Sequence, residues 1–83
     1  MTAKLVIIYS QPDCPPCEWV KEYLRERGVE FEVRDVTRDA AALQELTVKH
    51  RSQSTPTTVI GEEVMIGFDP EWLAARLGGK LAK

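Results

Sequence analysis

Cys14-Pro15-Pro16-Cys17 contains the only two cysteines of this 83-residue sequence. It follows an apolar run typical of a strand and opens a segment with helical periodicity. A disulfide across it closes a loop of four residues. The loop-entropy model gives such a bridge about 2 kcal/mol, against about 3 kcal/mol for a loop of about 15 residues. Because the bridge would stabilise the fold so little, the spacing favours a reversible, redox-active disulfide over a structural one.

The sequence on either side predicts an alternation of strands and helices. In chain order, we expect a strand at Leu5–Tyr9, a helix at Pro15–Arg27, a strand at Val29–Arg34, a helix at Asp39–Lys49, strands at Thr57–Ile60 and Val64–Ile66, and a helix from Asp69-Pro70 to Leu77. Gly28 and Gly78-Gly79 are typical of helix ends. In the second helix, Ala42, Leu43 and Leu46 are predicted to face the core.

The order βαβαββα predicts an α/β fold. The first two strands are joined through a helix, so they should lie parallel with a right-handed crossover, and the later hairpin should add antiparallel strands. The expected result is a four-stranded mixed sheet with helices on both faces, in a thioredoxin-like layout. At this length, with 43% hydrophobic residues, we expect residues 1–83 to form one domain.

Composition indicates the cellular compartment and the kinds of partner to expect. Two cysteines are too few for the disulfide framework of a small secreted protein. The N-terminal residues lack the long apolar stretch of a signal peptide. We therefore expect a cytoplasmic protein. The net charge of −2 favours neither nucleic acid nor a membrane as a partner.

Three segments together carry a family resemblance. The run from Tyr9 to Cys17 follows an apolar strand, Ser54-Thr55-Pro56 precedes the hairpin, and Gly67-Phe68-Asp69 precedes the last helix. On these motifs the sequence resembles the glutaredoxin family, and it is most similar to the NrdH-type glutaredoxin-like redoxins, which donate electrons to ribonucleotide reductase. The resemblance implies a thiol–disulfide oxidoreductase that reduces a disulfide-containing protein, with ribonucleotide reductase as one such target.

The placement of the two cysteines predicts their roles in thiol–disulfide exchange. Cys14 lies just before the helix, where the positive helix end lowers the pKa of a thiol from its ordinary value of about 8.5. Cys17 lies one turn further on and should be more buried. Cys14 is therefore the predicted nucleophile and Cys17 the predicted resolving cysteine of a redox-active disulfide.

The neighbours of Cys14 should keep this lowering of its pKa moderate. Pro15 and Pro16 have no N–H group, so the Cys17 N–H is the main backbone donor to the Cys14 sulfur. Asp13 adds a negative charge that opposes the thiolate. Lys21 is the nearby basic residue that could offset it.

The predicted substrate-binding residues come from the resemblance. It implies a cis peptide bond at Thr55-Pro56, beside the cysteine pair, which the small cost of a cis proline bond permits. The backbone of Thr55 would then be open to pair with an extended substrate segment. Gly67, Phe68 and Asp69 are the further candidates.

Asp69 has two interpretations. In glutathione-using glutaredoxins, a Gly-Gly pair and then an Asp precede this helix, whose N-terminus holds the glutamyl part of glutathione. Here Ile66 replaces the first glycine, and an Asp before Pro70 is equally typical of a helix cap. Phe68 and Trp72 could form a patch for a partner or part of the core, and we expect Trp72 to lie in the core.

Two reductants are possible from the sequence. The missing Gly-Gly pair favours a thioredoxin reductase over glutathione, as does Gln11, at a position where glutaredoxins often have a basic residue. The alternative is a glutathione-dependent glutaredoxin. A further alternative, of another class, is a binding module that senses redox state without turnover.

We expect a monomer without a bound cofactor or metal. A structural zinc site needs four ligands, whereas the sequence offers two cysteines and His50 alone. His50 itself is expected to be a solvated residue at a helix end. Some glutaredoxins share an iron–sulfur cluster between two chains, but on the family pattern a proline inside the motif disfavours it. An arsenate-reductase-like enzyme would share the fold, but the pattern of its second catalytic arginine is missing.

Overall fold

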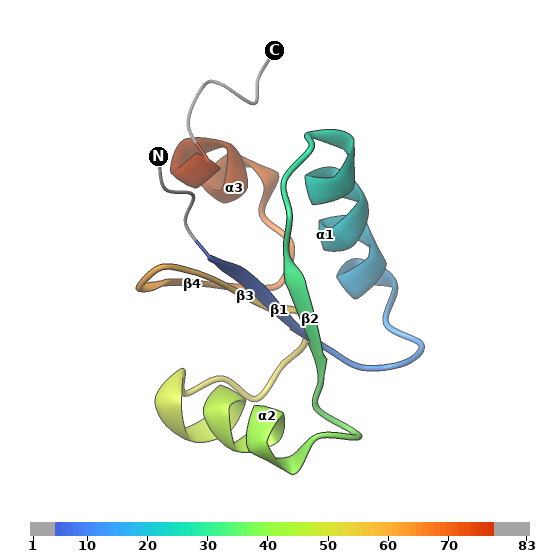
Figure 1. The fold of residues 1–83 in the computed structure, drawn as a ribbon, viewed down its shortest axis with the longest axis vertical. Helices are drawn as coiled ribbons and strands as arrows, with labels where there is room; N and C mark the ends of the chain where they lie inside the picture. The colour runs from blue at the N-terminus through green and yellow to red at the C-terminus, as the bar shows by residue number, and fades with distance from the viewer. Residues whose placement is uncertain (1–4, 78–83) are drawn as a thin grey trace.

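The computed structural model describes residues 5–77 of the chain. Its helices and strands are, in chain order, β1 (Val6–Ser10), α1 (Pro15–Glu26), β2 (Glu32–Asp35), α2 (Ala40–Gln44), the π-helical turn η1 (Glu45–Lys49), β3 (Thr57–Ile60), β4 (Glu63–Ile66) and α3 (Pro70–Leu77). Figure 1 shows their arrangement. The predicted order βαβαββα is confirmed. The predicted helix end at Gly78-Gly79 lies outside the described residues.

The four strands form one mixed sheet in the order β2-β1-β3-β4. β1 runs parallel to β2 and antiparallel to β3, and β3 pairs with an antiparallel β4. α1 and α3 cover one face of the sheet, and α2 covers the other (Figure 1). β1 thus lies between two strands and between two helical layers, which explains why its sequence is apolar without alternation.

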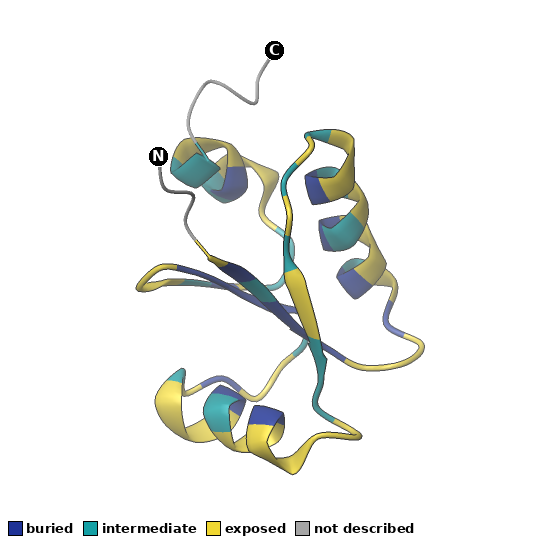
Figure 2. Ribbon diagram, viewed as in Figure 1, coloured by how far each residue is buried: buried dark blue, intermediate teal, exposed yellow. Residues whose placement is uncertain are grey.

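Two apolar clusters hold these layers together, one on each face of the sheet. Toward α1 and α3, the buried cluster consists of Val6, Ile8, Val20, Leu24, Ile60, Met65 and Leu73. Toward α2, it consists of Tyr9, Ala42, Leu46 and Val59. Figure 2 shows the buried side of α1 turned toward the sheet and its exposed side turned outward. Burial contributes about 1.5–3 kcal/mol for each aliphatic side chain, so the first cluster anchors α1 and with it the cysteine pair.

β2 begins at Glu32, later than the predicted start at Val29. Gly28 explains the difference. It has a φ of 72° just after α1, a left-handed conformation that favours glycine. The N–H groups of Gly28 and Val29 donate to the carbonyl groups of Arg25 and Leu24. This Schellman motif uses Val29 to close the helix, so strand pairing starts only after it.

The predicted helix at Asp39–Lys49 is a short α-helix followed by a π-helical turn. Asp39 caps α2 by accepting two N–H groups of its first turn, at 3.0 and 3.2 Å. Ala42 and Leu46 are buried as predicted, but Leu43 is 45% exposed, so its assignment to the core was wrong. Only one line of side chains at i, i+4 spacing faces the sheet, and Leu43 lies beside that line.

β3 and β4 form a tight hairpin. Ile60 pairs with Glu63, so Gly61 and Glu62 make a two-residue turn. Gly61 has the positive φ, 62°, that such turns need at their first position. β4 therefore begins one residue before Val64, the predicted start. From the end of β4 the chain passes directly to the segment before α3.

Candidate active site

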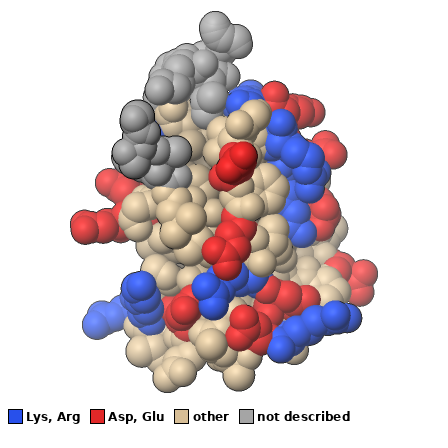
Figure 3. Space-filling view, in the orientation of Figure 1, with Lys and Arg blue, Asp and Glu red and all other residues tan. Residues whose placement is uncertain are grey.

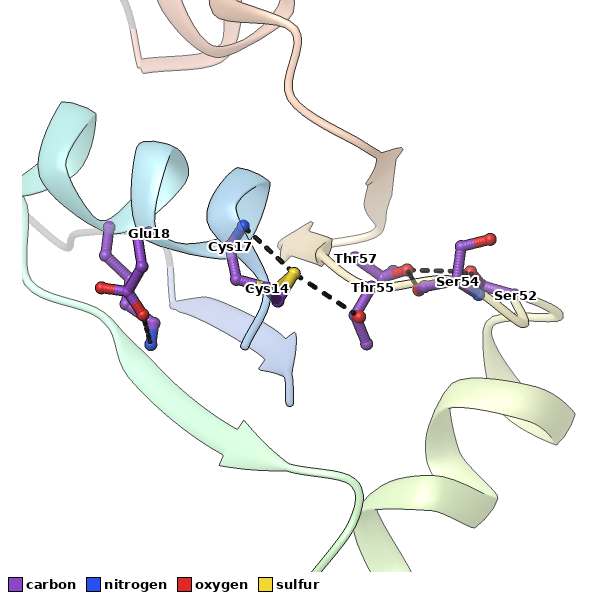
Figure 4. The surroundings of a disulfide bond; sticks show 8 residues. Cys14, Cys17, Glu18, Ser52, Ser54, Thr55 and Thr57 are labelled. Atoms are coloured by element: carbon purple, nitrogen blue, oxygen red, sulfur yellow. Dashed lines mark hydrogen bonds and ion pairs between the residues drawn. A yellow bond between two sulfur atoms is a disulfide. The ribbon is translucent and has the colours of Figure 1, made fainter. Parts of the chain in front are cut away.

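The cysteine pair lies at the N-terminus of α1, in the loop that follows β1. Cys14 and Cys17 are joined by a disulfide, with their Cα atoms 5.2 Å apart (Figure 4). Cys14 is 9% exposed and Cys17 is 0% exposed. An incoming sulfur can therefore reach Cys14 but not Cys17.

The Cys14 sulfur caps α1. It accepts the N–H of Cys17 at 3.3 Å, as predicted. Pro15 and Pro16 occupy the two positions before that donor and have no N–H to offer. The sulfur thus lies at the positive end of the helix, where a thiolate is stabilised, but with a single backbone donor.

A second polar group, which the sequence pattern did not reveal, faces the same sulfur. The Thr55 hydroxyl oxygen lies 3.8 Å from the sulfur of Cys14. The peptide bond between Thr55 and Pro56 is cis, as predicted. Pro56 is buried, and its carbonyl accepts the N–H of Gly67 at 2.8 Å. The site therefore combines the start of α1, the loop before β3 and the segment after β4.

A buried hydroxyl network holds the loop that carries Thr55. Ser52 and Thr57 are 2% and 0% exposed, and their hydroxyl oxygens lie 2.8 Å apart. The Thr57 hydroxyl donates to the Ser54 carbonyl at 2.6 Å, and the Ser54 N–H donates to the Ser52 hydroxyl at 3.3 Å (Figure 4). The sequence pattern did not indicate this network. It also gave no sign that the hydroxyls of Ser52 and Thr57 are buried.

The two charged residues expected to affect Cys14, Asp13 and Lys21, do not pair with each other. Asp13 is exposed and has a left-handed φ of 57°. Lys21 pairs with Glu18 at 3.0 Å, one turn along α1. Lys21 therefore neutralises Glu18 rather than Asp13.

Asp69 caps α3. Its carboxylate accepts the N–H of Trp72 at 3.2 Å. Gly67, with φ 88°, turns the chain between β4 and this cap. Trp72 is half-buried and packs against the core cluster beneath α1 and α3, as expected. Capping is thus the observed role of Asp69.

Phe68 joins a small aromatic group beside α1. Its ring centroid lies 6.2 Å from that of Trp19 and 6.0 Å from that of Tyr23. Phe68 is half-buried, whereas Trp19 is 54% exposed. The group therefore has both a packed side and a side open to solvent.

His50 differs from the solvated helix-end residue that the sequence predicted. It does follow η1, but its ring is half-buried, with Nε2 3.4 Å from the Tyr9 hydroxyl. Burial lowers the pKa of His50, and the charge of Lys49 lowers it further. Tyr9 donates its hydroxyl to Glu45 at 2.8 Å. Burial, then this bond to Glu45, raises the pKa of Tyr9 to about 12.

The described residues offer neither a metal site nor a membrane-spanning helix. Between residues 5 and 77, no three side chains of His, Cys, Asp or Glu converge as a metal ion would require. Within the same span, no helix is both long enough and apolar enough to cross a membrane.

Comparison with known proteins places the chain in a family. The glutaredoxin family model matches residues 6–65, and the chain belongs to that family. By sequence it is similar to the gene 56 protein of Mycobacterium phage D29, at 36% identity over 67 residues, which cover 80% of this chain and 74% of that protein.

Solved structures extend this comparison to the fold. The thioredoxin-like protein BC3987 is 49% identical with a TM-score of 0.81, over 87% of this chain and 97% of that one. NrdH-redoxin from Escherichia coli is 29% identical with a TM-score of 0.78, over 88% of this chain and 93% of that one. The sheet and helices thus form a thioredoxin-like fold. With its paired cysteines, the chain is a thiol–disulfide oxidoreductase whose redox-active centre is the Cys14–Cys17 disulfide.

Proposed function

We propose that this protein is an electron donor of the NrdH-redoxin type, which reduces protein disulfides and is itself reduced by a thioredoxin reductase. The observation that carries the proposal is the segment before α3, where the exposed side chain of Ile66 replaces the first glycine of the Gly-Gly pair in glutathione-using glutaredoxins. The Trp72 N–H at this helix start is already bonded to the Asp69 carboxylate at 3.2 Å. Because glutathione-using glutaredoxins also have this Asp, the cap is shared with them, and the side chain of Ile66 is the difference that disfavours glutathione.

In the proposed reaction, Cys14 is the nucleophile and Cys17 the resolving cysteine. The Cys14 thiolate attacks one sulfur of the target disulfide, and the other target sulfur leaves as a thiolate and takes up a proton. Cys17 loses its proton and attacks the Cys14 sulfur of the mixed disulfide, which releases the second target sulfur. The target gains two electrons, the Cys14–Cys17 disulfide forms, and the reductase returns two electrons to it.

The unequal burial of the two cysteines supports this order of steps. Cys14 is 9% exposed and Cys17 is 0% exposed, so the target meets Cys14 first. Cys17 then needs no access to the target, because it attacks a sulfur to which it is adjacent within one helical turn.

The target segment is proposed to bind along Thr55 and Pro56, with Gly67, Phe68 and Asp69 beside it. Within residues 5–77, neither the N–H nor the carbonyl of Thr55 has a backbone hydrogen-bond partner. Both are therefore available to an extended chain, in the manner of an added strand.

The proposed partners follow from the likeness to NrdH-redoxin. That protein is described as glutaredoxin-like with a thioredoxin-like activity profile. We propose that ribonucleotide reductase is one target of this chain, and that the chain acts as a monomer in the cytoplasm without a bound cofactor.

Glutathione as the reductant is the second candidate. It is favoured by the exposure of Asp69, which leaves the start of α3 within reach of a small molecule. A tripeptide bound there would use the helix start that holds the glutamyl part of glutathione in other glutaredoxins.

Reduction of insulin disulfides by NADPH and thioredoxin reductase tests the proposal. Insulin reduction should rise with the concentration of this chain. A Cys17→Ser chain is the matched control, and it should stop at a mixed disulfide that mass spectrometry detects. A chain whose disulfide dithiothreitol reduces, but which turns over with neither thioredoxin reductase nor glutathione, would overturn the proposal and favour a redox-sensing binding module.

A further inference from the structure

The sheet face toward α2 is only partly covered. A cavity of about 650 Å³ lies there, between η1 and strands β1, β3 and β4. Its lining includes neither Cys14 nor Cys17, nor the Thr55-Pro56 bond. We call it the far-face cavity, and it is separate from the redox site.

The floor of the far-face cavity is apolar. Leu5, Ile7, Val59 and Val64 line it. Leu5 is 62% exposed, Ile7 and Val64 are half-buried, and only Val59 belongs to the buried cluster beneath α2. The helical layer is too short to cover these strands, so apolar surface of the sheet stays open to solvent.

The rim beside η1 carries unpaired positive charge. Lys49 and Arg51 line the cavity, and neither has an ion-pair partner among residues 5–77. Figure 3 shows basic side chains at the lower left, over η1. Glu62 is the acidic side chain of the opposite rim.

The other charged residues of the cavity form a network that leaves one donor free. Arg34 lies 3.5 Å from Glu45, which also accepts the Tyr9 hydroxyl, so the negative charge of Glu45 is compensated. The Nε of Arg34 is buried and has no hydrogen-bond partner in the described part of the chain. Because this atom is buried, a ligand in the cavity cannot reach it, so Lys49 and Arg51 are the cations left for a ligand.

The backbone at Arg51 is left-handed, so glycine would fit this position as well. Arg51 has a φ of 56° at the end of η1, where the Ser52 N–H closes the turn on the Leu46 carbonyl at 2.9 Å. Glycine adopts this left-handed conformation freely, whereas arginine does so with strain. Stability alone would favour glycine, and π-helical turns are frequent at functional sites.

We propose that the far-face cavity binds a small amphipathic organic anion, with its apolar body on Ile7, Val59 and Val64 and its anionic group at Lys49 and Arg51. The volume lies within the range of about 300–1,000 Å³ typical of small-molecule sites. The apolar floor alone would accept a neutral ligand. The basic rim adds the preference for an anion.

Two fluorescent probes with the same apolar body test this preference. 8-Anilinonaphthalene-1-sulfonate carries a sulfonate, and N-phenyl-1-naphthylamine is its neutral counterpart. We expect the anionic probe to bind more tightly, and backbone NMR shifts with the anionic probe to change at Ile7, Lys49 and Val64. Equal affinities would overturn the proposal, as would shift changes confined to Trp19 and Phe68.

Substitutions on the rim test the site itself. Arg51→Gly removes the charge and also suits the left-handed backbone, so the folded state should be at least as resistant to urea as the wild type. Arg51→Gly and Lys49→Gln should each weaken the anionic probe about threefold, and together about tenfold. Neither should change the affinity of the neutral probe.

Arg38→Gln is the matched control, because Arg38 is a surface arginine outside the cavity. It should leave both affinities unchanged. Unchanged binding of the anionic probe in the Arg51→Gly, Lys49→Gln double variant would overturn the proposal, and so would equal weakening by Arg38→Gln.

Discussion

α1 and α3 begin in the same way, with a capping side chain followed by proline, yet the two caps differ in chemistry. At α1 the cap is the sulfur of Cys14, 3.3 Å from the Cys17 N–H. At α3 the cap is the carboxylate of Asp69, 3.2 Å from the Trp72 N–H. Each satisfies an N–H that has no partner inside its helix. The same positive helix end therefore holds a reactive sulfur at one site and an inert carboxylate at the other.

A comparison with α2 shows what the prolines at the start of α1 change. At α2, which lacks proline at its start, Asp39 accepts two N–H groups of the first turn, at 3.0 and 3.2 Å. At α1, Pro16 takes the place of the first of these donors, so Cys14 meets only one. A helix start can therefore stabilise its capping atom more or less strongly, according to the number of N–H groups it offers.

The largest expected effect separates capping from chemistry at α1. Cys14→Ser keeps a good capping residue but removes the redox nucleophile, so insulin reduction should fall to background while circular dichroism stays unchanged. Residual turnover in the Cys14→Ser chain would contradict the assignment of Cys14 as nucleophile.

Removal of the cap at α3 should affect stability and not chemistry. Asp69→Ala should lower the free energy of unfolding by about 1 kcal/mol, measured by urea denaturation. The rate at a saturating concentration of thioredoxin reductase should stay the same, because Asp69 lies beside the proposed partner segment and not at the reacting sulfurs. Asp39→Ala at α2 is the matched control with a similar loss of stability. If Asp69→Ala remained folded but reacted slowly even with saturating thioredoxin reductase, Asp69 would act in the chemistry and the comparison would fail.

Addition of a donor at α1 should make it resemble α2. Pro16→Ala restores an N–H group near the Cys14 sulfur, which lowers the pKa of the thiol. A further hydrogen bond of about 1 kcal/mol raises the thiolate fraction about fivefold while the thiol predominates. The ultraviolet absorbance of the thiolate against pH measures this. A pKa that rises in Pro16→Ala would contradict the role given to the proline.

The Thr55 hydroxyl is expected to contribute less than a backbone donor. It lies 3.8 Å from the Cys14 sulfur, so Thr55→Val should slow the reaction with a small disulfide about twofold at neutral pH. Ser52→Ala is the comparison variant, because it loosens the loop without removing the hydroxyl that faces the sulfur. An unchanged rate in Thr55→Val would limit Thr55 to its backbone role.

The smallest effect concerns the opposite end of a helix. A helix C-terminus favours a cation, yet burial and the charge of Lys49 lower the pKa of His50 at the end of η1. The unfolded chain therefore binds this proton more readily than the folded chain. The free energy of unfolding decreases as the pH is lowered below about 6.5. His50→Gln should remove that loss, as urea titrations at several pH values would show. An identical pH dependence in both chains would contradict it.

Much of the fold and the core of the site could be predicted because local chemistry determines them. Proline fixes φ at a helix start, and glycine freely adopts the left-handed conformation that ends a helix, so the CxxC motif, Gly28 and Pro70 marked the helix boundaries. The cis bond at Pro56 is a local feature as well, although it was inferred from the family resemblance.

The features that were not predicted arise from contacts between distant parts of the chain. His50 is half-buried because Tyr9, from β1, lies against it. Leu43 is exposed because the sheet contacts only the line of Ala42 and Leu46. The Thr55 hydroxyl meets Cys14 only once β3 pairs beside β1. No short stretch of sequence contains that information.

The central claim is that electrons reach the Cys14–Cys17 disulfide from a thioredoxin reductase rather than from glutathione. Its most direct test is NADPH consumption by the wild-type chain with insulin, in two parallel reactions. One contains thioredoxin reductase alone, and the other contains glutathione with glutathione reductase. The account predicts rapid consumption in the first and consumption near background in the second. Strong consumption only with glutathione would contradict it.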